Sequence, residues 1–247
     1  MTYPPPELPW LDPGAPFPAP DLAWADDSPA PGLLAAGGAL DVQSLKRAYA
    51  HGIFPWFSDG QPLLWWSTDP RMVLEVETFR LHRSLRKRIT ALLTNGRLEI
   101  RIDTEFARVI TACANAPRPG QSGTWIVPDM VDAYCALHEA GLAHSVETWI
   151  DGELVAGLYC VALGKAVFGE SMFTLLPDGS KIALAALVAF CHAHAIPQID
   201  CQQVTAHLAS LGARPMPRAQ FLLAMRRQLN QPAPHWDFSP VYWKLLF

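Results

Sequence analysis

Two short segments of this chain put polar side chains into runs that otherwise have the composition of buried strands. Residues 169–173 contain Glu170, and residues 199–202 contain Asp200 and Gln202. Carboxyl and amide groups are costly to bury unless they are hydrogen-bonded or take part in chemistry. The two segments therefore predict either a polar spot at the floor of an apolar pocket or a pair of satisfied polar groups in the core.

The size and composition of the chain are typical of a globular protein. It has 247 residues, of which half are apolar and 17% are charged, enough for one large domain or two small ones. Its five cysteines are odd in number and form no C-x-x-C pair, which favours reduced thiols over disulfides or a zinc site. The longest apolar stretch, residues 182–191, is far shorter than the ~20 residues of a membrane span. We therefore expect a cytoplasmic protein without a membrane or metal partner.

The charge is unevenly distributed. The net charge is −4, but residues 1–45 hold six acids and no Lys or Arg, so the rest of the chain carries +2. With so weak an overall field, any nucleic-acid contact needs a local basic patch. The predicted helix over residues 80–93 offers one, at Arg83, Arg86, Lys87 and Arg88, outside its apolar stripe. A solvated helix face is the alternative.

The sequence divides into three parts. Residues 1–31 hold ten of the 23 prolines and predict an extended N-terminal segment. Residues 32–70 predict a small α+β domain with a helix that starts at Asp41 and ends at Gly52, followed by short strands and tight turns. Residues 71–247 predict a second, larger domain.

The larger domain has the pattern of a mixed sheet covered by helices, an α+β or α/β sandwich. Strands are predicted over residues 143–149, 154–163, 166–173 and 196–203. Helices are predicted over residues 80–93, 103–114, 129–141, 180–195 with Ser180 as its cap, 204–211 and 218–229.

Six further strings, read in order, resemble one known family. They are Gly-Ile-Phe-Pro-Trp-Phe at 52–57, Trp-Trp-Ser at 65–67, Asp-Pro-Arg at 69–71, Gly-Thr-Trp-Ile at 123–126, His-Ser-Val-Glu at 144–147 and Ser-Leu-Gly-Ala at 210–213. In order and spacing the set resembles the bacterial leucyl/phenylalanyl-tRNA–protein transferases, from about residue 32 to about residue 221. The resemblance implies that the second domain is similar to the N-acetyltransferase (GNAT-like) superfamily.

The resemblance also implies a function. The chain would move Leu or Phe, and also Met, from an aminoacyl-tRNA onto the α-amine of a protein whose N-terminal residue is Arg or Lys. This would mark the acceptor for degradation in the N-degron pathway. Because the aminoacyl ester is already activated, we expect no cofactor, no metal and no acyl-enzyme.

The polar residues of the two strand-like segments match the catalytic residues of that family. Asp200 and Gln202 stand two apart on a predicted strand, so we expect them on one face. We expect Gln202 to orient the attacking amine while Asp200 fixes its amide, and Glu170 to receive a cationic group of the acceptor. The alternatives are that Asp200 caps the next turn and that Glu170 forms a strand-end ion pair with Lys181 or an arginine.

The resemblance assigns the remaining site residues by position. The pocket for the donor side chain would be lined by Leu158, Val167, Met172, Phe173, Leu187 and Ile199. The 3′-terminal adenosine would contact Trp56, Trp125 and Tyr134, since stacking on an aromatic ring is the usual way to hold an unpaired base. The tRNA body would lie on the basic helix. Each of these residues also suits an ordinary core or surface position.

Two other classes of function compete with this reading. An acyl-CoA-dependent N-acetyltransferase would need a pyrophosphate-binding glycine turn at a helix start, and residues 177–181 match it poorly. A non-catalytic RNA-binding protein would leave the polar residues of the apolar pocket without a purpose.

Overall fold

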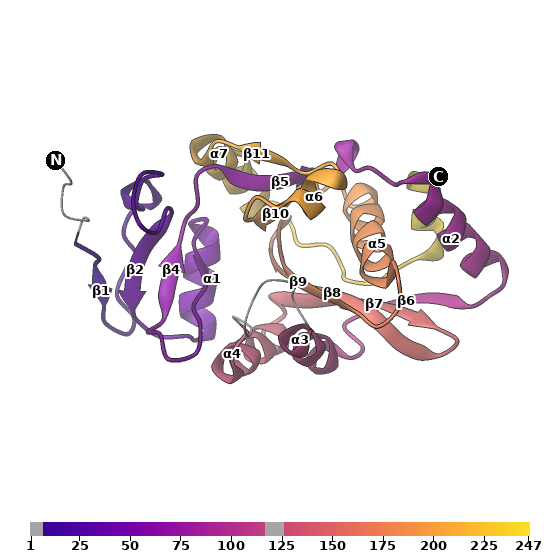
Figure 1. The fold of residues 1–247 in the computed structure, drawn as a ribbon, viewed down its shortest axis with the longest axis horizontal. Coiled ribbons are helices and arrows are strands. Elements are labelled where there is room, and N and C mark those ends of the chain that lie inside the picture. Colours follow the sequence, from indigo (N-terminus) through magenta and orange to yellow (C-terminus); the bar gives the residue numbers. More distant parts are fainter. Residues whose placement is uncertain (1–6, 117–125) are drawn as a thin grey trace.

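The fold contains two sheets, described by a computed structural model over residues 7–116 and 126–247. The smaller sheet has the order β1-β2-β4-β3, made of Trp10–Leu11, Leu33–Gly37, Leu64–Trp66 and Phe54–Pro55. Helix α1 (Val42–Ala50) lies between this sheet and the rest of the molecule (Figure 1). It begins as predicted, because the Asp41 carboxylate accepts a 2.7 Å hydrogen bond from the Ser44 amide.

The larger sheet has seven strands in the order β11-β5-β10-β9-β8-β7-β6. Its strands are β5 (Arg71–Glu75), β6 (Leu98–Ile102), β7 (Ala143–Ile150), β8 (Glu153–Leu163), β9 (Ala166–Thr174), β10 (Gln198–Gln202) and β11 (Arg214–Met216). The pair β9 and β10 is parallel, and the pairs on either side of it are antiparallel. Because parallel neighbours need a crossover, helix α5 (Gly179–Ala193) connects them.

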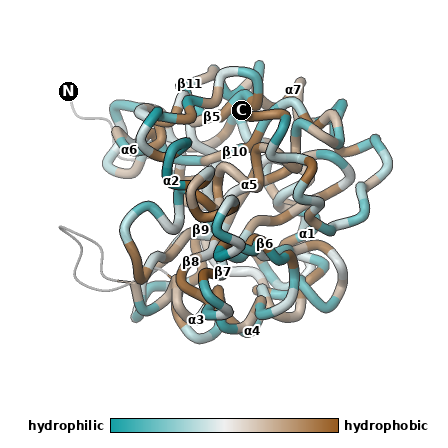
Figure 2. Tube along the Cα trace, turned by 90° about the vertical axis from the view of Figure 1, so that its right-hand side faces the viewer, coloured by the Kyte–Doolittle hydropathy of each residue, from teal (hydrophilic) through white to brown (hydrophobic). Residues whose placement is uncertain are grey.

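Helices cover both faces of this sheet. Helix α5 lies on one face, and helices α3 (Phe106–Asn115) and α4 (Pro128–Glu139) lie on the other (Figure 1). Apolar segments gather along the central strands, whereas hydrophilic segments lie mainly at the periphery (Figure 2). Helix α5 is apolar on nearly all sides because the C-terminal segment covers it, with Trp236 stacked on Phe190 at 4.5 Å between ring centroids.

Three further helices lie at the edge of the larger sheet or beyond it. They are α2 (Arg83–Thr94), α6 (Ala206–Ser210) and α7 (Arg218–Leu229). Short 3₁₀ turns occur at η1 (Pro20–Leu22), η2 (Val76–Thr78) and η3 (Pro240–Leu245). The predicted α+β class and mixed sheet covered by helices are confirmed.

Two details differ from the sequence prediction. The short strands β6 and β11 were not predicted, and both form edges of the sheet. Ser180 is not the cap of α5, because the helix already begins at Gly179 and its cap position is Asp178, with a left-handed φ of 62°. Gly179 is required there, since a Cβ would lie 2.7 Å from both the Ala156 Cβ and the Thr174 Oγ1.

The division into residues 1–31, 32–70 and 71–247 stays a prediction. Strand β1 comes from the proline-rich segment and pairs in parallel with β2, so part of that segment belongs to the smaller sheet. The larger sheet begins at Arg71, directly after the predicted boundary.

Gly212, in the turn after α6, packs closely against the segment that precedes α2. Gly212 has a φ of +107°, and a Cβ there would lie 2.3 Å from the Thr78 carbonyl oxygen. Gly141 also has a positive φ, +71°, but a Cβ there would meet nothing within 4 Å. We expect Gly141→Ala to cost about 1–2 kcal/mol of unfolding free energy from backbone strain alone. Gly212→Ala should cost clearly more, because the backbone of residue 78 must also move.

Urea unfolding of the two variants measures this difference. Equal losses of stability would show that the turn tolerates a side chain and that the close approach to Thr78 is unimportant.

Candidate active site

A cavity of about 590 Å³ lies where the two sheets meet. Its walls come from β3, β8, β9, α5, β10 and α6. The apolar part of the lining includes Phe54, Leu158, Met172, Leu184, Leu187, Ile199 and Leu208. The polar part includes Glu170, Gln202, Gln203, Thr205 and His207. The cavity therefore has the size and mixed lining of a small-molecule site.

The parallel pairing of β9 with β10 brings the polar groups together. Ile199 pairs with Val167 and Asp200 with Phe168, so Glu170 and Gln202 lie close on adjacent strands. The Gln202 Nε2 donates a 2.9 Å hydrogen bond to the Glu170 Oε1. The sequence predicted a polar spot beside an apolar pocket. In the structure, a direct hydrogen bond between the side chains of the two segments forms it.

Asp200 does not share the face of Gln202, and this prediction was wrong. The pairing with β5 has a bulge between Asp200 and Gln202, and Gln202 has a left-handed φ of 54°. The bulge breaks the two-residue alternation, so Gln202 lines the cavity while Asp200 lies behind it. Both oxygens of Asp200 accept from the fully buried Arg71, at 2.9 Å from Nε and 2.7 Å from Nη2.

The carboxylate of Asp200 contacts the backbone of Gln202, not its side-chain amide. The Oδ1 atom accepts a 2.9 Å hydrogen bond from the Gln202 amide nitrogen, which is the local turn that the alternative interpretation described. The side-chain amide is instead held by Glu170. Asp200 therefore supports the backbone of the site from outside the cavity.

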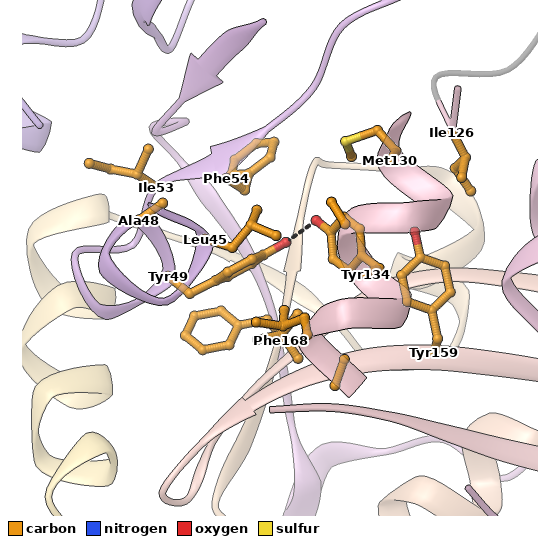
Figure 3. Packing of buried hydrophobic residues seen from close by; sticks show 14 of the residues in the cluster. Leu45, Ala48, Tyr49, Ile53, Phe54, Ile126, Met130, Tyr134, Tyr159 and Phe168 are labelled. Atoms are coloured by element: carbon orange, nitrogen blue, oxygen red, sulfur yellow. Dashed lines mark hydrogen bonds between the residues drawn. The ribbon is translucent and has the colours of Figure 1, made fainter. Parts of the chain in front are cut away.

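Two buried tyrosines hold Glu170 from the other side. The Tyr134 hydroxyl donates to the Glu170 Oε2 at 3.3 Å and lies 2.5 Å from the Tyr49 hydroxyl. Figure 3 shows Tyr49 on α1 and Tyr134 on α4 pointing toward each other. Glu170 forms no ion pair with Lys181, because the Lys181 Nζ bonds Asp178 at 2.8 Å. The alternative of a strand-end ion pair with this lysine is therefore wrong.

Burial raises the pKa of Glu170 to about 8. The hydrogen bonds from Tyr49 and Tyr134 act in the opposite direction, and the negative charge of Asp200 raises the pKa further. Burial and the neighbouring Glu170 raise the pKa of both tyrosines well above the usual range, so they stay neutral hydrogen-bonding groups. The balance of these effects favours the protonated, neutral form of Glu170.

The predicted donor-side-chain residues lie on two sides of the sheet. Leu158, Met172, Leu187 and Ile199 line the cavity. Val167 is buried in the core beside α5, and Phe173 packs in the other core, next to Gly157. Phe173 follows Met172 on β9, and alternation along a strand sends the two side chains to opposite faces.

The three aromatic residues predicted to hold a base have different surroundings. Trp56 lines the cavity. Tyr134 is fully buried and its ring packs edge-on against Tyr159, so a base could stack on it only after the ring moved. Trp125 lies outside the described residues.

The basic helix begins beside the cavity. Arg83, Arg86 and Lys87 are exposed on α2, and Arg88 is half-buried. Just before α2, the His82 Nε2 lies 3.0 Å from the Ser210 carbonyl oxygen, at the end of α6. Helix α6 contributes cavity-lining residues, so the basic surface starts next to the element that closes one side of the cavity.

Among the residues that sequence reasoning missed are Arg71 and Tyr49, which contact Asp200 and Tyr134. Each had a signal that was not used. Arg71 is a charged residue at the start of an apolar strand, and such a residue is buried only when it is paired. Tyr49 lies on the apolar face of α1, so its ring is expected to be buried. A buried tyrosine hydroxyl usually has a hydrogen-bond partner, and none was predicted.

Within residues 7–116 and 126–247, no group of His, Cys, Asp and Glu could hold a metal ion, and no helix is long and apolar enough to cross a membrane. Burial raises the pKa of the cavity residue Cys201 to about 12, so its sulfur stays a thiol. An apolar hole beside a carboxyl–amide pair suits an enzyme that holds an apolar group next to a polar reaction partner.

Comparison of the chain with known sequences agrees with this class of protein. Residues 73–226 match the family profile "Leucyl/phenylalanyl-tRNA protein transferase", and residues 38–69 match the profile of that family's N-terminal domain. A protein of Albidiferax ferrireducens called leucyl/phenylalanyl-tRNA–protein transferase is 60% identical over 246 residues, covering 100% of this chain and 97% of the relative. A protein of the same name from Polaromonas sp. is 61% identical over 237 residues, covering 96% and 93%.

The chain belongs to the leucyl/phenylalanyl-tRNA–protein transferase family, as the sequence motifs predicted. Among solved structures, a GCN5-related N-acetyltransferase from Kribbella flavida is similar with a TM-score of 0.35 and 13% identity, over 68% of this chain and 58% of that one. The L-PGS of Bacillus licheniformis is similar with a TM-score of 0.40 and 10% identity, over 76% and 70%. Likenesses this weak identify no activity.

The raised pKa of Glu170 predicts a specific pH dependence of stability. The folded protein keeps this proton up to about pH 8, whereas the unfolded carboxyl releases it near its ordinary pKa of 4.5. The stabilising contribution is therefore complete below pH 4.5 and is lost as the pH rises through 8. Glu170→Gln keeps a neutral side chain at every pH, so its unfolding free energy should rise relative to wild type between pH 5 and pH 9.

The exposed Glu139 on α4 provides the control, since Glu139→Gln should show no such trend. Denaturant unfolding at several pH values measures both differences. A constant difference between wild type and Glu170→Gln would contradict a neutral buried Glu170.

Proposed function

We propose that this protein transfers Leu, Phe or Met from an aminoacyl-tRNA to the α-amine of a protein whose N-terminal residue is Arg or Lys. The observation that carries the proposal is the junction of the apolar cavity floor with the Gln202–Glu170 pair. The family names of its relatives support the donor and the acceptor class. We further propose that the modified N-terminus marks the acceptor for degradation in the cytoplasm.

The donor side chain occupies the apolar end of the cavity. Leu, Phe and Met have no polar group in common, so selection there rests on shape and apolar contact. Met172, which is flexible and polarizable, suits a wall that accommodates more than one shape. The ester bond then lies toward the polar end.

In the reaction, the α-amine of the acceptor attacks the ester carbonyl. The new bond is the amide C–N bond, and the bond that breaks joins the acyl carbon to the ribose oxygen of the tRNA. The amine loses a proton, and the ribose oxygen leaves as a hydroxyl. Since the ester supplies the driving force, the chain has to hold and orient the two substrates.

Gln202 orients the attacking amine. Its Nε2 donates a hydrogen bond to Glu170, and its side-chain amide oxygen can accept a hydrogen bond from the amine. An amide oxygen is far too weak a base to take the proton. Gln202 therefore positions the amine, and the proton leaves through water or the leaving hydroxyl.

Glu170 holds the cationic part of the acceptor. A positive charge brought next to a buried carboxylic acid lowers its pKa, so binding of Arg or Lys releases the Glu170 proton and forms an ion pair. This links acceptor binding to pH and discriminates against neutral N-terminal residues, which offer no positive charge to this carboxyl.

The tRNA lies across the mouth of the cavity toward α2. Trp56 stacks on the terminal adenosine at the cavity wall, and Arg83, Arg86, Lys87 and Arg88 contact phosphates.

The transfer assay tests this function directly. Purified protein, labelled Leu-tRNA and a peptide that begins with Arg should yield labelled peptide without ATP or coenzyme A. Met172→Asp should abolish transfer of both Leu and Phe, because a carboxylate in the apolar end must lose its water against the donor side chain. Met216→Asp is the matched control, since this half-buried methionine lies on the edge strand β11 and away from the cavity.

Unlabelled peptide with the wild-type protein would refute the function. Normal Leu and Phe transfer by Met172→Asp would refute the location of the donor pocket while leaving the activity intact.

The basic helix is tested by its salt dependence. The double variant Arg83→Glu and Lys87→Glu should weaken tRNA binding equally for every donor. The slope of log affinity against log salt should become shallower by about one unit for each lost phosphate contact. The control is Arg226→Glu with Arg227→Glu, an exposed basic pair on α7.

Fluorescence titrations at several salt concentrations give the slope. An unchanged slope in the α2 variant, or the same change in the α7 variant, would exclude α2 as the tRNA-binding surface.

A further inference from the structure

Arg71 is fully buried at the start of β5, directly behind the cavity wall. Its guanidinium carbon lies 4.8 Å from the ring centroids of both Phe54 and Phe221. Phe54 is itself a cavity-lining residue. A planar, weakly hydrated guanidinium is suited to this position between two rings, whereas a compact ammonium is not.

All three nitrogen atoms of the guanidinium donate hydrogen bonds. Its Nε and Nη2 atoms form two parallel hydrogen bonds to the two oxygens of Asp200, at 2.9 and 2.7 Å. Its Nη1 atom donates to the Gly52 carbonyl oxygen at 3.1 Å. A bidentate pair of this kind fixes the rotation of the carboxylate as well as its distance. The segment before β3 and the strand β10 are thereby tied to the same side chain.

The fixed carboxylate in turn holds an unfavourable backbone conformation. The Asp200 Oδ1 accepts from the amide of Gln202, a residue that is not glycine and has a φ of 54°. Such a conformation persists only where its surroundings determine it. This turn directs the Gln202 side chain to Glu170 and into the cavity. The contacts form one chain from the guanidinium of Arg71, through Asp200 and the backbone, to the side-chain amide.

We propose that Arg71 is a positioning residue for the transfer reaction, and that it acts by locking the left-handed turn at Gln202 through Asp200. This inference rests on the proposed function. Arg71 and Asp200 do not line the cavity, so neither touches the substrates or takes the proton of the amine. Their role is to keep the Gln202 amide at the distance and angle that the attacking amine requires.

A purely structural ion pair would have a different effect on the kinetics. It would hold the two sheet regions together, and its loss would weaken the binding of both substrates and lower the melting temperature in parallel. A positioning role affects the chemical step, because a displacement of about 1 Å at a reacting group costs on the order of 100-fold in rate. The ratio of the changes in kcat and KM separates the two roles.

The test uses Arg71→Lys, which keeps the charge but cannot form the two parallel hydrogen bonds. In the transfer of Leu from tRNA to an Arg-peptide, we expect kcat to fall on the order of 100-fold. The KM for Leu-tRNA should stay within about twofold, since the donor pocket and the basic helix are unchanged. The matched control is Arg218→Lys, because Arg218 bonds the Ser67 carbonyl oxygen at 2.6 Å in the same region of the fold.

A double-mutant cycle adds a second readout. Asp200→Asn should lower kcat in the wild-type background and cause little further loss in the Arg71→Lys background, because both changes release the same turn. Additive losses would overturn the proposal, as would a normal kcat in Arg71→Lys or an equal loss in Arg218→Lys. An Arg71→Lys protein that does not fold would also overturn it, by showing a structural role.

The outcome for the wild-type protein separates this proposal from the function on which it rests. No Leu transfer by wild type would refute the proposed function. Transfer by wild type together with unaffected Arg71→Lys kinetics would refute only the role of Arg71.

Discussion

The parallel pairing of β9 with β10 is the interaction on which the site depends. These strands are separated in the sequence by helix α5, and the crossover places them side by side in the middle of the seven-stranded sheet. Without this pairing, Glu170 and Gln202 would be isolated polar groups in apolar strands. With it, each satisfies the other through a 2.9 Å hydrogen bond. The cost of burying two polar side chains is thus offset by the same contact that defines the polar end of the cavity.

The two carboxyl groups of the site have very different neighbours. Asp200 lies against a guanidinium that supplies two charge-assisted hydrogen bonds, and removing one partner of such a buried pair costs about 3–5 kcal/mol. Glu170 accepts hydrogen bonds from neutral donors, the hydroxyls of Tyr49 and Tyr134 and the amide of Gln202, so desolvation dominates and raises its pKa to about 8. An ion-paired carboxylate therefore lies behind the strand, whereas the carboxyl inside the cavity lies among neutral donors and has a raised pKa.

The sequence predicted the helices and strands better than it predicted the directions in which their side chains point. The helices α1 and α2, the hairpin of β8 and β9 and the strand β10 follow from periodicity and turn residues. Alternation also places Met172 in the cavity, but the bulge before Gln202 cannot be read from a strand pattern, because its left-handed backbone is held by the distant Arg71. Likewise, Tyr49 could be assigned to the apolar face of α1, whereas its contact with Tyr134 depends on how α1 packs against α4. Local patterns determine which elements form, and the site is made by contacts between elements that are far apart in the chain.

The smaller sheet is part of the site and not an appendage to it. This sheet and the adjoining helix α1 and turns supply Phe54 and Trp56 to the cavity wall, Tyr49 to the hydroxyl pair, and the Gly52 carbonyl oxygen to Arg71. Gly52 has a φ of +72°, and a Cβ there would lie 2.4 Å from the Leu222 Cδ2, so the chain passes closely between α7 and the guanidinium. The Tyr49 hydroxyl, Phe54 and Trp56 reduce the access of water to Glu170, and this desolvation is the main cause of its raised pKa. The raised pKa of Glu170 is therefore a consequence of the packing of the smaller sheet and α1 against the larger sheet.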